Sequence, residues 1–303
     1  MHLPRPLVVA TSGPVYRLGL YRRVPVRWQR RILGSPAAMM RLPADTRVEH
    51  TTLGNRPAER VIVGASERPR AILFLHGGGY TVGSPRLYRA CAAVLARASN
   101  SVVYCLDYRL APEHPFPAAL DDAVAAFREL ITVQGLDPSR VAIAGDSAGG
   151  GLSVAAARVL TDAGLAPAAL GLISPWTDPS DEEFTRQRDF VVNLRGGRLS
   201  ASHYRGSVDA RDPGYAPIHG RLDGLPPTLI HCSPNEMLYP QIVRFAGLLE
   251  GAGVQVTLVA QERWWHSVHV LAGMLREATD AVRDLGAFLR AHLDAAPARE
   301  SAG

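Results

Sequence analysis

Short apolar runs alternate with longer amphipathic stretches along most of this 303-residue chain. The apolar runs lack strict polar alternation, which is typical of strands buried on both faces of a parallel sheet. These runs lie at 71–75, 101–106, 141–144, 169–173, 228–232 and 255–259. Helical patterning lies between or after them, at 87–98, 116–133, 148–163 and 268–293. We therefore expect an α/β protein with a mostly parallel sheet covered by helices on both faces.

Three segments depart from this alternation. Residues 46–53 and 58–63 have the pattern of short strands joined by a turn at Gly54-Asn55, which predicts an antiparallel opening to the sheet. The segment before them is rich in Arg and Pro, and Gly34-Ser35-Pro36 is a loop signal between two short helical candidates. Residues 176–226 interrupt the rhythm with Pro, Gly and charge, which predicts an insertion above the carboxyl ends of the strands.

The composition is that of a globular protein, with 47% hydrophobic and 20% charged residues. No apolar run approaches the roughly 18–20 residues that span a bilayer. The apolar run at 7–10 stops at Gly13-Pro14, too soon for a signal peptide. We therefore expect a cytoplasmic protein without stable membrane insertion.

Three cysteines are present, an odd number without metal-ligand spacing. They are Cys91, Cys105 and Cys232. Two of them lie in apolar runs, where a buried thiol is the usual environment. We expect structural roles for all three and no metal site.

The net charge of +5 raises the question of a nucleic-acid partner. Much of the excess comes from six early arginines: Arg17, Arg22, Arg23, Arg27, Arg30 and Arg31. No basic motif interleaved with aromatic residues accompanies them. They could line a helix face that contacts anionic surfaces, but we favour the solvated face of an amphipathic helix, and we expect no nucleic-acid partner.

A serine in a Gly-rich turn is the first candidate for chemistry. Gly145-Asp146-Ser147-Ala148-Gly149 matches G-x-S-x-G and lies between a predicted strand and a predicted helix. That context fits a nucleophile elbow, a strained strand-to-helix turn that needs small neighbours and exposes the serine hydroxyl. The N-terminus of the following helix also favours developing negative charge. These features favour Ser147 as a nucleophile over an ordinary loop serine.

Consecutive glycines follow the predicted strand at 71–75, in His76-Gly77-Gly78-Gly79-Tyr80. An acyl-transfer enzyme stabilises its oxyanion with backbone N–H donors, which glycines present without side-chain obstruction. A turn that serves backbone geometry alone is the other explanation. Together with the elbow, the glycines predict an oxyanion hole that the N–H of Ala148 completes.

A nucleophilic serine needs a base, and the chain holds ten histidines. Where such an elbow serves a triad, the chain order is serine, acid, histidine, so the base should follow the last strand. His266 lies in the loop after that strand, from which it can reach the elbow. His269, expected in the first turn of the last helix, is the competitor. We favour His266 because of its position.

The acid should follow a strand between Ser147 and His266. Glu236 follows the run at 228–232, and Asp178 follows the run at 169–173. Asp223 precedes its strand and should lie at the opposite end of the sheet. A carboxylate in either of the first two positions could fix the imidazole tautomer. The alternative for Glu236 is a helix N-terminal carboxylate.

Three motifs together resemble the bacterial hormone-sensitive-lipase family of esterases. They are HGGGY at 76–80, YRLAPEHPFPAALDD at 108–122 and GDSAGGG at 145–151. The second motif distinguishes this family from other α/β hydrolases. The similarity extends through LISPWTD at 172–178 to the His266 region.

The resemblance implies an α/β-hydrolase fold with an eight-stranded sheet and a helical cap. Residues 1–45 would supply cap helices, and residues 46–303 the catalytic domain with a cap insertion around 178–222. It implies hydrolysis of short- to medium-chain acyl esters, small-molecule substrates, without a cofactor. The motifs carry over Ser147 as nucleophile, His266 as base, and Gly77, Gly78 and Ala148 as oxyanion donors.

The acid position departs from the commonest family pattern. Many members have aspartate there, whereas the corresponding residue in this chain is Glu236, as in a subgroup with a similar glutamate motif. The resemblance therefore assigns Glu236 rather than Asp178 as the acid. It also implies a possible homodimer, since members often pair through the last strand.

Two rival functions follow from the same residues. An amidase, lactonase or deacetylase would use the same triad, because a fold does not fix the substrate. A ligand-binding protein on a retired hydrolase scaffold is the other rival. It is disfavoured because such proteins should have lost a triad member, and here Ser147, His266 and an acid are all present.

Overall fold

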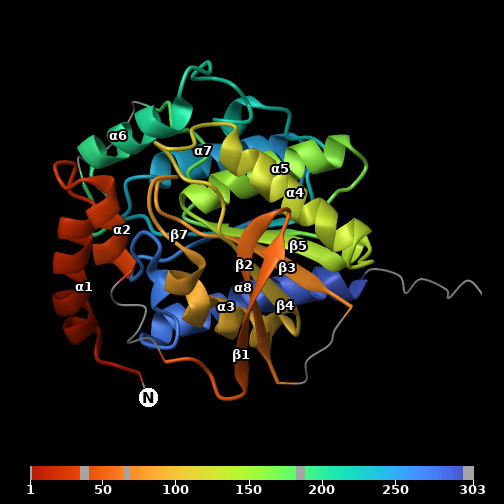
Figure 1. Ribbon diagram of the computed structural model, residues 1–303, viewed down its shortest axis with the longest axis horizontal. Helices are drawn as coiled ribbons and strands as arrows, with labels where there is room; N and C mark the ends of the chain where they lie inside the picture. Colours follow the sequence, from red (N-terminus) through yellow and green to blue (C-terminus); the bar gives the residue numbers. More distant parts are fainter. Residues whose placement is uncertain (1, 35–40, 65–68, 182–187, 296–303) are drawn as a thin grey trace, which may run out of the picture.

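Eight strands form a single sheet in the order β1-β2-β4-β3-β5-β6-β7-β8 (Figure 1). The computed structural model describes residues 2–34, 41–64, 69–181 and 188–295. The strands are β1 (Thr46–Leu53), β2 (Arg56–Val63), β3 (Ala71–Leu75), β4 (Val102–Leu106), β5 (Val141–Asp146), β6 (Leu170–Ile173), β7 (Thr228–Cys232) and β8 (Val256–Ala260). β2 is antiparallel to β1 and β4, and all other neighbours are parallel. The predicted α/β-hydrolase sheet with its antiparallel opening is confirmed.

Apolar side chains hold both faces of the sheet. In β3, Leu73 and Leu75 enter one core while Ile72 and Phe74 enter the other, because successive strand residues point to opposite faces. One core lies under α4 (Ala118–Thr132), α5 (Ala148–Asp162) and α7 (Tyr239–Gly251). The other lies under α3 (Pro85–Ser99) and α8 (Arg276–Ala295). This double burial explains why the strand sequences lack polar alternation.

Three further helices lie together at one side of the molecule, away from the sheet (Figure 1). They are α1 (Arg5–Gly19), α2 (Val26–Gly34) and α6 (Leu194–Arg205). The ring of Phe190 packs edge-on against Tyr16 of α1, with 5.9 Å between centroids. Tyr204 of α6 stacks on Tyr80 of the glycine loop at 3.6 Å. The N-terminal segment and the segment after β6 therefore meet beside the glycine loop.

Arg30 of α2 differs from the expectation that the early arginines form a solvated face. Its Nε donates a hydrogen bond to the carbonyl of Thr81 at 2.9 Å, and one terminal nitrogen donates to the carbonyl of Ala111 at 3.1 Å. The same guanidinium pairs with Glu113 at 2.7 Å. Arg30 therefore attaches α2 to the loops that follow β3 and β4.

The N-terminal helix boundaries also differ from the prediction. α1 ends at Gly19 and α2 ends at Gly34, so Gly34 follows both helices and does not separate them. Ser35 and Pro36 lie outside the described residues. α1 continues through Pro14, and its Val8 and Gly13 are buried. Packing of these small and apolar residues overrides the helix-breaking tendency of the sequence.

The expected helix at 268–293 is two elements. A short 3-10 turn, η4 (Val268–Leu271), is separated from α8 by a bend at Gly273. Gly273 has a φ of 83°, and a Cβ there would lie 2.7 Å from the carbonyl oxygen of Arg41. A left-handed glycine is therefore needed where the chain turns against this carbonyl.

The three cysteines are buried and free, as expected. Among the helices of the described ranges, none combines the length and the apolar character that a bilayer span requires.

Candidate active site

Ser147 lies in a strained turn between β5 and α5. Its φ is 54° and its ψ is −116°, a conformation that a residue with a side chain rarely adopts. A Cβ on Gly145 would lie 2.2 Å from the carbonyl oxygen of Gly149, and one on Gly149 would lie 2.0 Å from that of Leu75. The flanking glycines are therefore required, which explains the G-x-S-x-G spacing of the elbow.

His266 lies between Ser147 and Glu236. Its Nε2 is 2.9 Å from Oγ of Ser147, and its Nδ1 is 3.0 Å from Oε2 of Glu236. All three residues are buried, with His266 at 2% and Glu236 at 1% exposure. The geometry fits a ring that donates its Nδ1–H to the carboxylate and accepts the serine proton at Nε2.

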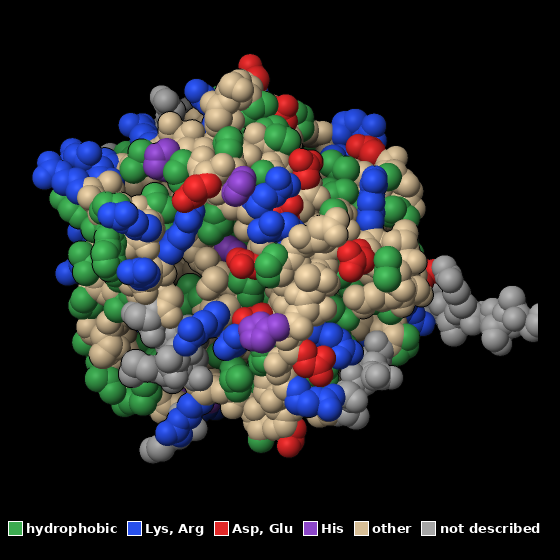
Figure 2. All heavy atoms as spheres, viewed as in Figure 1, with side chains coloured by type: hydrophobic (Ala, Val, Ile, Leu, Met, Phe, Trp, Pro, Cys, Tyr) green, Lys and Arg blue, Asp and Glu red, His purple; other side chains and the backbone are tan. Residues whose placement is uncertain are grey.

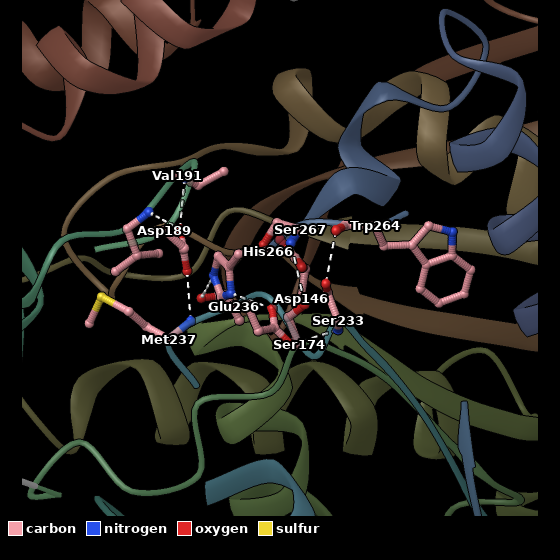
Figure 3. A network of polar contacts seen from close by, with 12 residues as sticks. Asp146, Ser174, Asp189, Val191, Ser233, Glu236, Met237, Trp264, His266 and Ser267 are labelled. Atoms are coloured by element: carbon pink, nitrogen blue, oxygen red, sulfur yellow. Dashed lines mark hydrogen bonds and ion pairs between the residues drawn. The ribbon is translucent and has the colours of Figure 1, made fainter. Parts of the chain in front are cut away.

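The Glu236 carboxylate is held on both oxygens. Oε2 faces His266, while Oε1 accepts a hydrogen bond from the N–H of Ser233 at 3.2 Å. Asp189 accepts a hydrogen bond from the next N–H, that of Met237, at 2.8 Å (Figure 3). The loop after β7 is thus held by its own contact between Ser233 and Glu236 and by Asp189 in the segment after β6.

Asp178, the alternative acid, faces elsewhere. Its Oδ2 is 3.1 Å from a guanidinium nitrogen of Arg244, and its Oδ1 accepts a hydrogen bond from the N–H of Ser180 at 3.1 Å. Of the two sequence candidates, the structure therefore brings Glu236 to His266 and leaves Asp178 with Arg244.

His269, the alternative base, is likewise engaged elsewhere. It lies in η4 rather than in the last helix, and its Nε2 is 3.0 Å from Nδ1 of His231. Burial is the main cause that lowers the pKa of His269. His231 in turn contacts Asp284 of α8 at 3.0 Å. This buried pair connects β7 to the segment that follows the His266 loop.

Opposing influences act on the His266 imidazole. Burial lowers its pKa, but the hydrogen bond and the charge of Glu236 outweigh burial and raise the pKa to about 9. More distant carboxylates, Asp189 and Asp146, act in the same direction. The site is therefore built to stabilise an imidazolium, the state a general base reaches after taking a proton.

The glycine loop runs beside the elbow. A Cβ on Gly77 would lie 2.6 Å from Oδ2 of Asp146, and Gly78 has a φ of 127° with a Cβ position 2.1 Å from the carbonyl of Val82. The His76 ring stacks on Tyr108 at 4.3 Å, and the Tyr108 hydroxyl donates to the His76 carbonyl at 2.6 Å. Tyr108 of the YRLAPEHPFPAALDD motif thus holds His76 of the HGGGY motif in place.

The N–H groups of this loop differ in their surroundings. Within the described ranges, those of Gly78, Gly79 and Ala148 have no hydrogen-bond acceptor. The N–H of Gly77 instead lies against the hydroxyl of Tyr88. Burial raises the pKa of this hydroxyl, and the contact with the Gly77 N–H acts to lower it. Donors free to meet a ligand oxygen are therefore found on both sides of Ser147.

A pocket of about 320 Å³ opens above Ser147 and His266. Figure 2 shows a recess in this face, bordered by basic side chains. Most of the lining is apolar, and much of it comes from α2, α6 and the connection between α1 and α2, including Leu20, Val24, Val26, Leu33, Leu194 and Leu199. In the described part of the chain, no cluster of His, Cys, Asp or Glu is suited to a metal ion.

Sequence reasoning did not single out Tyr88, Asp189 or Arg30 as site residues. Asp189 accepts hydrogen bonds from Val191 and Val192, each at 2.7 Å, as well as from Met237. Its role depends on how the segment after β6 packs, so no local motif could have revealed it.

Comparisons with known proteins agree with this architecture. Residues 72–270 match the family model described as alpha/beta hydrolase fold. The chain is 40% identical over 252 residues to the acetyl-hydrolase of Streptomyces hygroscopicus, covering 78% of this chain and 84% of that protein. It is 33% identical over 273 residues to esterase LipU of Mycobacterium tuberculosis strain H37Rv, covering 84% and 90%. A solved esterase from the bacterial hormone-sensitive lipase family superposes with a TM-score of 0.88 at 34% identity, covering 96% of this chain and 100% of that one.

Proposed function

The chain belongs to the bacterial hormone-sensitive-lipase family of α/β hydrolases and is a carboxylic ester hydrolase, and from that premise we propose that it cleaves short- to medium-chain acyl esters through Ser147, His266 and Glu236. The observation that carries the proposal is the continuous contact from Oγ of Ser147 through both ring nitrogens of His266 to Oε2 of Glu236. The strained elbow and the buried carboxylate support it.

The proposed reaction has two stages. Ser147 attacks the ester carbonyl as His266 accepts its proton, and the imidazolium then protonates the leaving alcohol. Water attacks the acyl-enzyme with His266 again as base, which releases the acid and restores the serine. Glu236 holds the ring orientation and stabilises its positive charge in both stages. No step requires a metal or an organic cofactor.

The oxyanion would be held by backbone N–H groups on both sides of Ser147. Our sequence prediction names Gly77, Gly78 and Ala148. Because the N–H of Gly77 lies against Tyr88, Gly79 is the alternative partner of Gly78 on the glycine-loop side. Donors of this kind are each worth roughly 10²–10³ in turnover.

The pocket supports the proposed substrate class. A volume of about 320 Å³ is at the small end for ligand sites, which suits short acyl chains, and the apolar lining suits hydrocarbon. We propose that α1, α2 and α6 act together as the cap over this pocket. No specific contact favours an amide or a lactone over an ester.

The test is an acyl-length series of p-nitrophenyl esters, run beside an amide and a lactone panel. We expect the highest kcat/KM from acetyl to hexanoyl. Ser147→Ala should lower kcat by on the order of 10⁴-fold or more and abolish labelling by a fluorophosphonate. Labelling that persists in Ser147→Ala, or absence of ester hydrolysis at every chain length, would overturn the proposal.

A further inference from the structure

The outer face of α1 is apolar, which is unusual for a surface helix. The exposed positions follow helical spacing, so they lie on one face. They are Pro6, Leu7, Ala10, Thr11, Pro14, Arg17 and Leu18. Leu7 is 49% exposed and Leu18 is 53% exposed, and this face carries no carboxylate. A polar face would be expected here if water were its only neighbour.

This face belongs to a wider concentration of exposed apolar side chains. Among the described residues, eleven large hydrophobic side chains are exposed, and six of them lie within the first 42 residues. Those six are Leu3, Leu7, Leu18, Tyr21, Trp28 and Leu42. Since this segment is a small part of the chain, scattered surface hydrophobics do not account for the clustering.

The same segment also carries a strong excess of positive charge. Residues 1–45 contain eight arginines and a single carboxylate, Asp45. In the described ranges, Arg17, Arg22, Arg23 and Arg27 have no ion-pair partner, whereas Arg31 lies over the Trp28 ring at 4.9 Å. Figure 2 shows hydrophobic and basic side chains together along the edge where α1 and α2 lie. Apolar and cationic groups thus share one surface.

We propose that this surface docks onto an anionic lipid layer. We define the α1–α2 face as Leu7, Arg17, Leu18, Tyr21, Arg27, Trp28 and Arg31. Helices that lie in a membrane interface combine Leu and Trp with Arg in this way, and juxtaposed arginines are attracted to anionic headgroups. A second copy of the chain is a poorer occupant, because a two-fold contact would bring the arginines of both copies together.

Docking here would bring the segment that lines one side of the pocket against the lipid surface. The inner residues of the same segment, including Leu20, Val24 and Val26, line the pocket above Ser147. An ester partitioned into the lipid layer would then reach the site without crossing much water. This last consequence rests on the proposed function, whereas the docking itself does not.

Vesicle sedimentation tests the docking with the full-length protein. We expect binding to vesicles of phosphatidylcholine and phosphatidylglycerol, little binding to phosphatidylcholine alone, and weakening by salt. The double variant Leu7→Gln/Leu18→Gln and the triple variant Arg17→Gln/Arg27→Gln/Arg31→Gln should each lower the affinity by about tenfold or more. The matched controls are Val133→Gln/Leu248→Gln and Arg128→Gln/Arg211→Gln, which change exposed residues of the same types elsewhere and should bind like wild type.

Hydrolysis of a dissolved p-nitrophenyl ester should be unchanged in the face variants, which shows that they fold. Binding is also measured with Ser147→Ala, so that a failure of the proposed chemistry leaves the binding result readable. The proposal is wrong if the wild-type protein does not bind anionic vesicles, or if the control variants lose as much binding as the face variants. It is also wrong if wild type sediments as a dimer that Leu7→Gln/Leu18→Gln dissociates, since the face would then belong to a second copy.

Discussion

The hydroxyl of Tyr88 donates a hydrogen bond to Oδ2 of Asp146 over 2.5 Å. Tyr88 belongs to α3, and Asp146 ends β5 immediately before Ser147. Both side chains are buried, and the N–H of Gly77 lies against the same hydroxyl. The contact therefore links the glycine loop, a core helix and the elbow, and it places a second carboxylate inside the site beside the proposed triad.

This carboxylate should make the stability depend on pH. Burial raises the pKa of Asp146 to about 6, although the charge of His266 and the bond from Tyr88 act against burial. Because the folded pKa is above the unfolded one, the stabilising effect of protonation is full below about pH 4 and is lost as the pH rises through about 6. Asp146→Asn resembles the neutral form at every pH.

We therefore expect Asp146→Asn to gain unfolding free energy relative to wild type as the pH increases. The gain between about pH 4.5 and about pH 7.5 should be on the order of 2 kcal/mol. Denaturant unfolding at the two pH values measures it. A difference between the two proteins that stays constant with pH would contradict the buried-charge explanation.

The activity should rise with pH because the base must be neutral to accept a proton. With the pKa of His266 raised to about 9, kcat/KM should increase as the pH rises toward that value. Glu236→Gln removes the hydrogen-bonded charge that opposes burial, so the midpoint of the profile should move to lower pH while the maximum falls. The measurement is kcat/KM against pH for both proteins, with non-enzymatic hydrolysis subtracted. An unshifted midpoint would mean that Glu236 does not set the His266 pKa.

The identity of the acid can be tested by three variants. Glu236→Gln should lower kcat by about 10⁴-fold, because the ring loses the acceptor that fixes its tautomer. Asp178→Asn should keep kcat close to wild type, since Asp178 contacts Arg244 rather than His266. Glu236→Asp keeps the charge but shortens the reach by one methylene, and an intermediate kcat is expected. A large loss in Asp178→Asn with little loss in Glu236→Gln would transfer the role to Asp178.

Local sequence rules went far toward predicting the sheet and the elbow. Buried parallel strands need continuous apolar runs, and the tight turn around Ser147 needs Gly145 and Gly149, so both leave local patterns. Chain order and family resemblance then selected His266 and Glu236, which the structure places in contact.

Contacts between distant segments left no such pattern. Tyr88 and Asp146 are 58 positions apart, and Arg30 meets Thr81 across 51 positions. A single arginine in a basic segment has the same local sequence whether it is solvated or bonded to a carbonyl. The bend at Gly273 was missed for a related reason, because it is set by the carbonyl of Arg41.

Arg30 should affect substrate binding through the position of α2. Its two hydrogen bonds to the carbonyls of Thr81 and Ala111 are partly buried, while the pair with the exposed Glu113 is screened by water. Arg30→Gln should therefore lower the unfolding free energy by about 1–3 kcal/mol and raise KM several-fold, because α2 lines the pocket. The kcat should change little, since the contacts among Ser147, His266 and Glu236 do not involve α2.

Arg27→Gln on the exposed side of the same helix is the matched control, measured on a dissolved p-nitrophenyl ester. Equal KM values for the two variants would show that Arg30 does not hold the cap over the pocket.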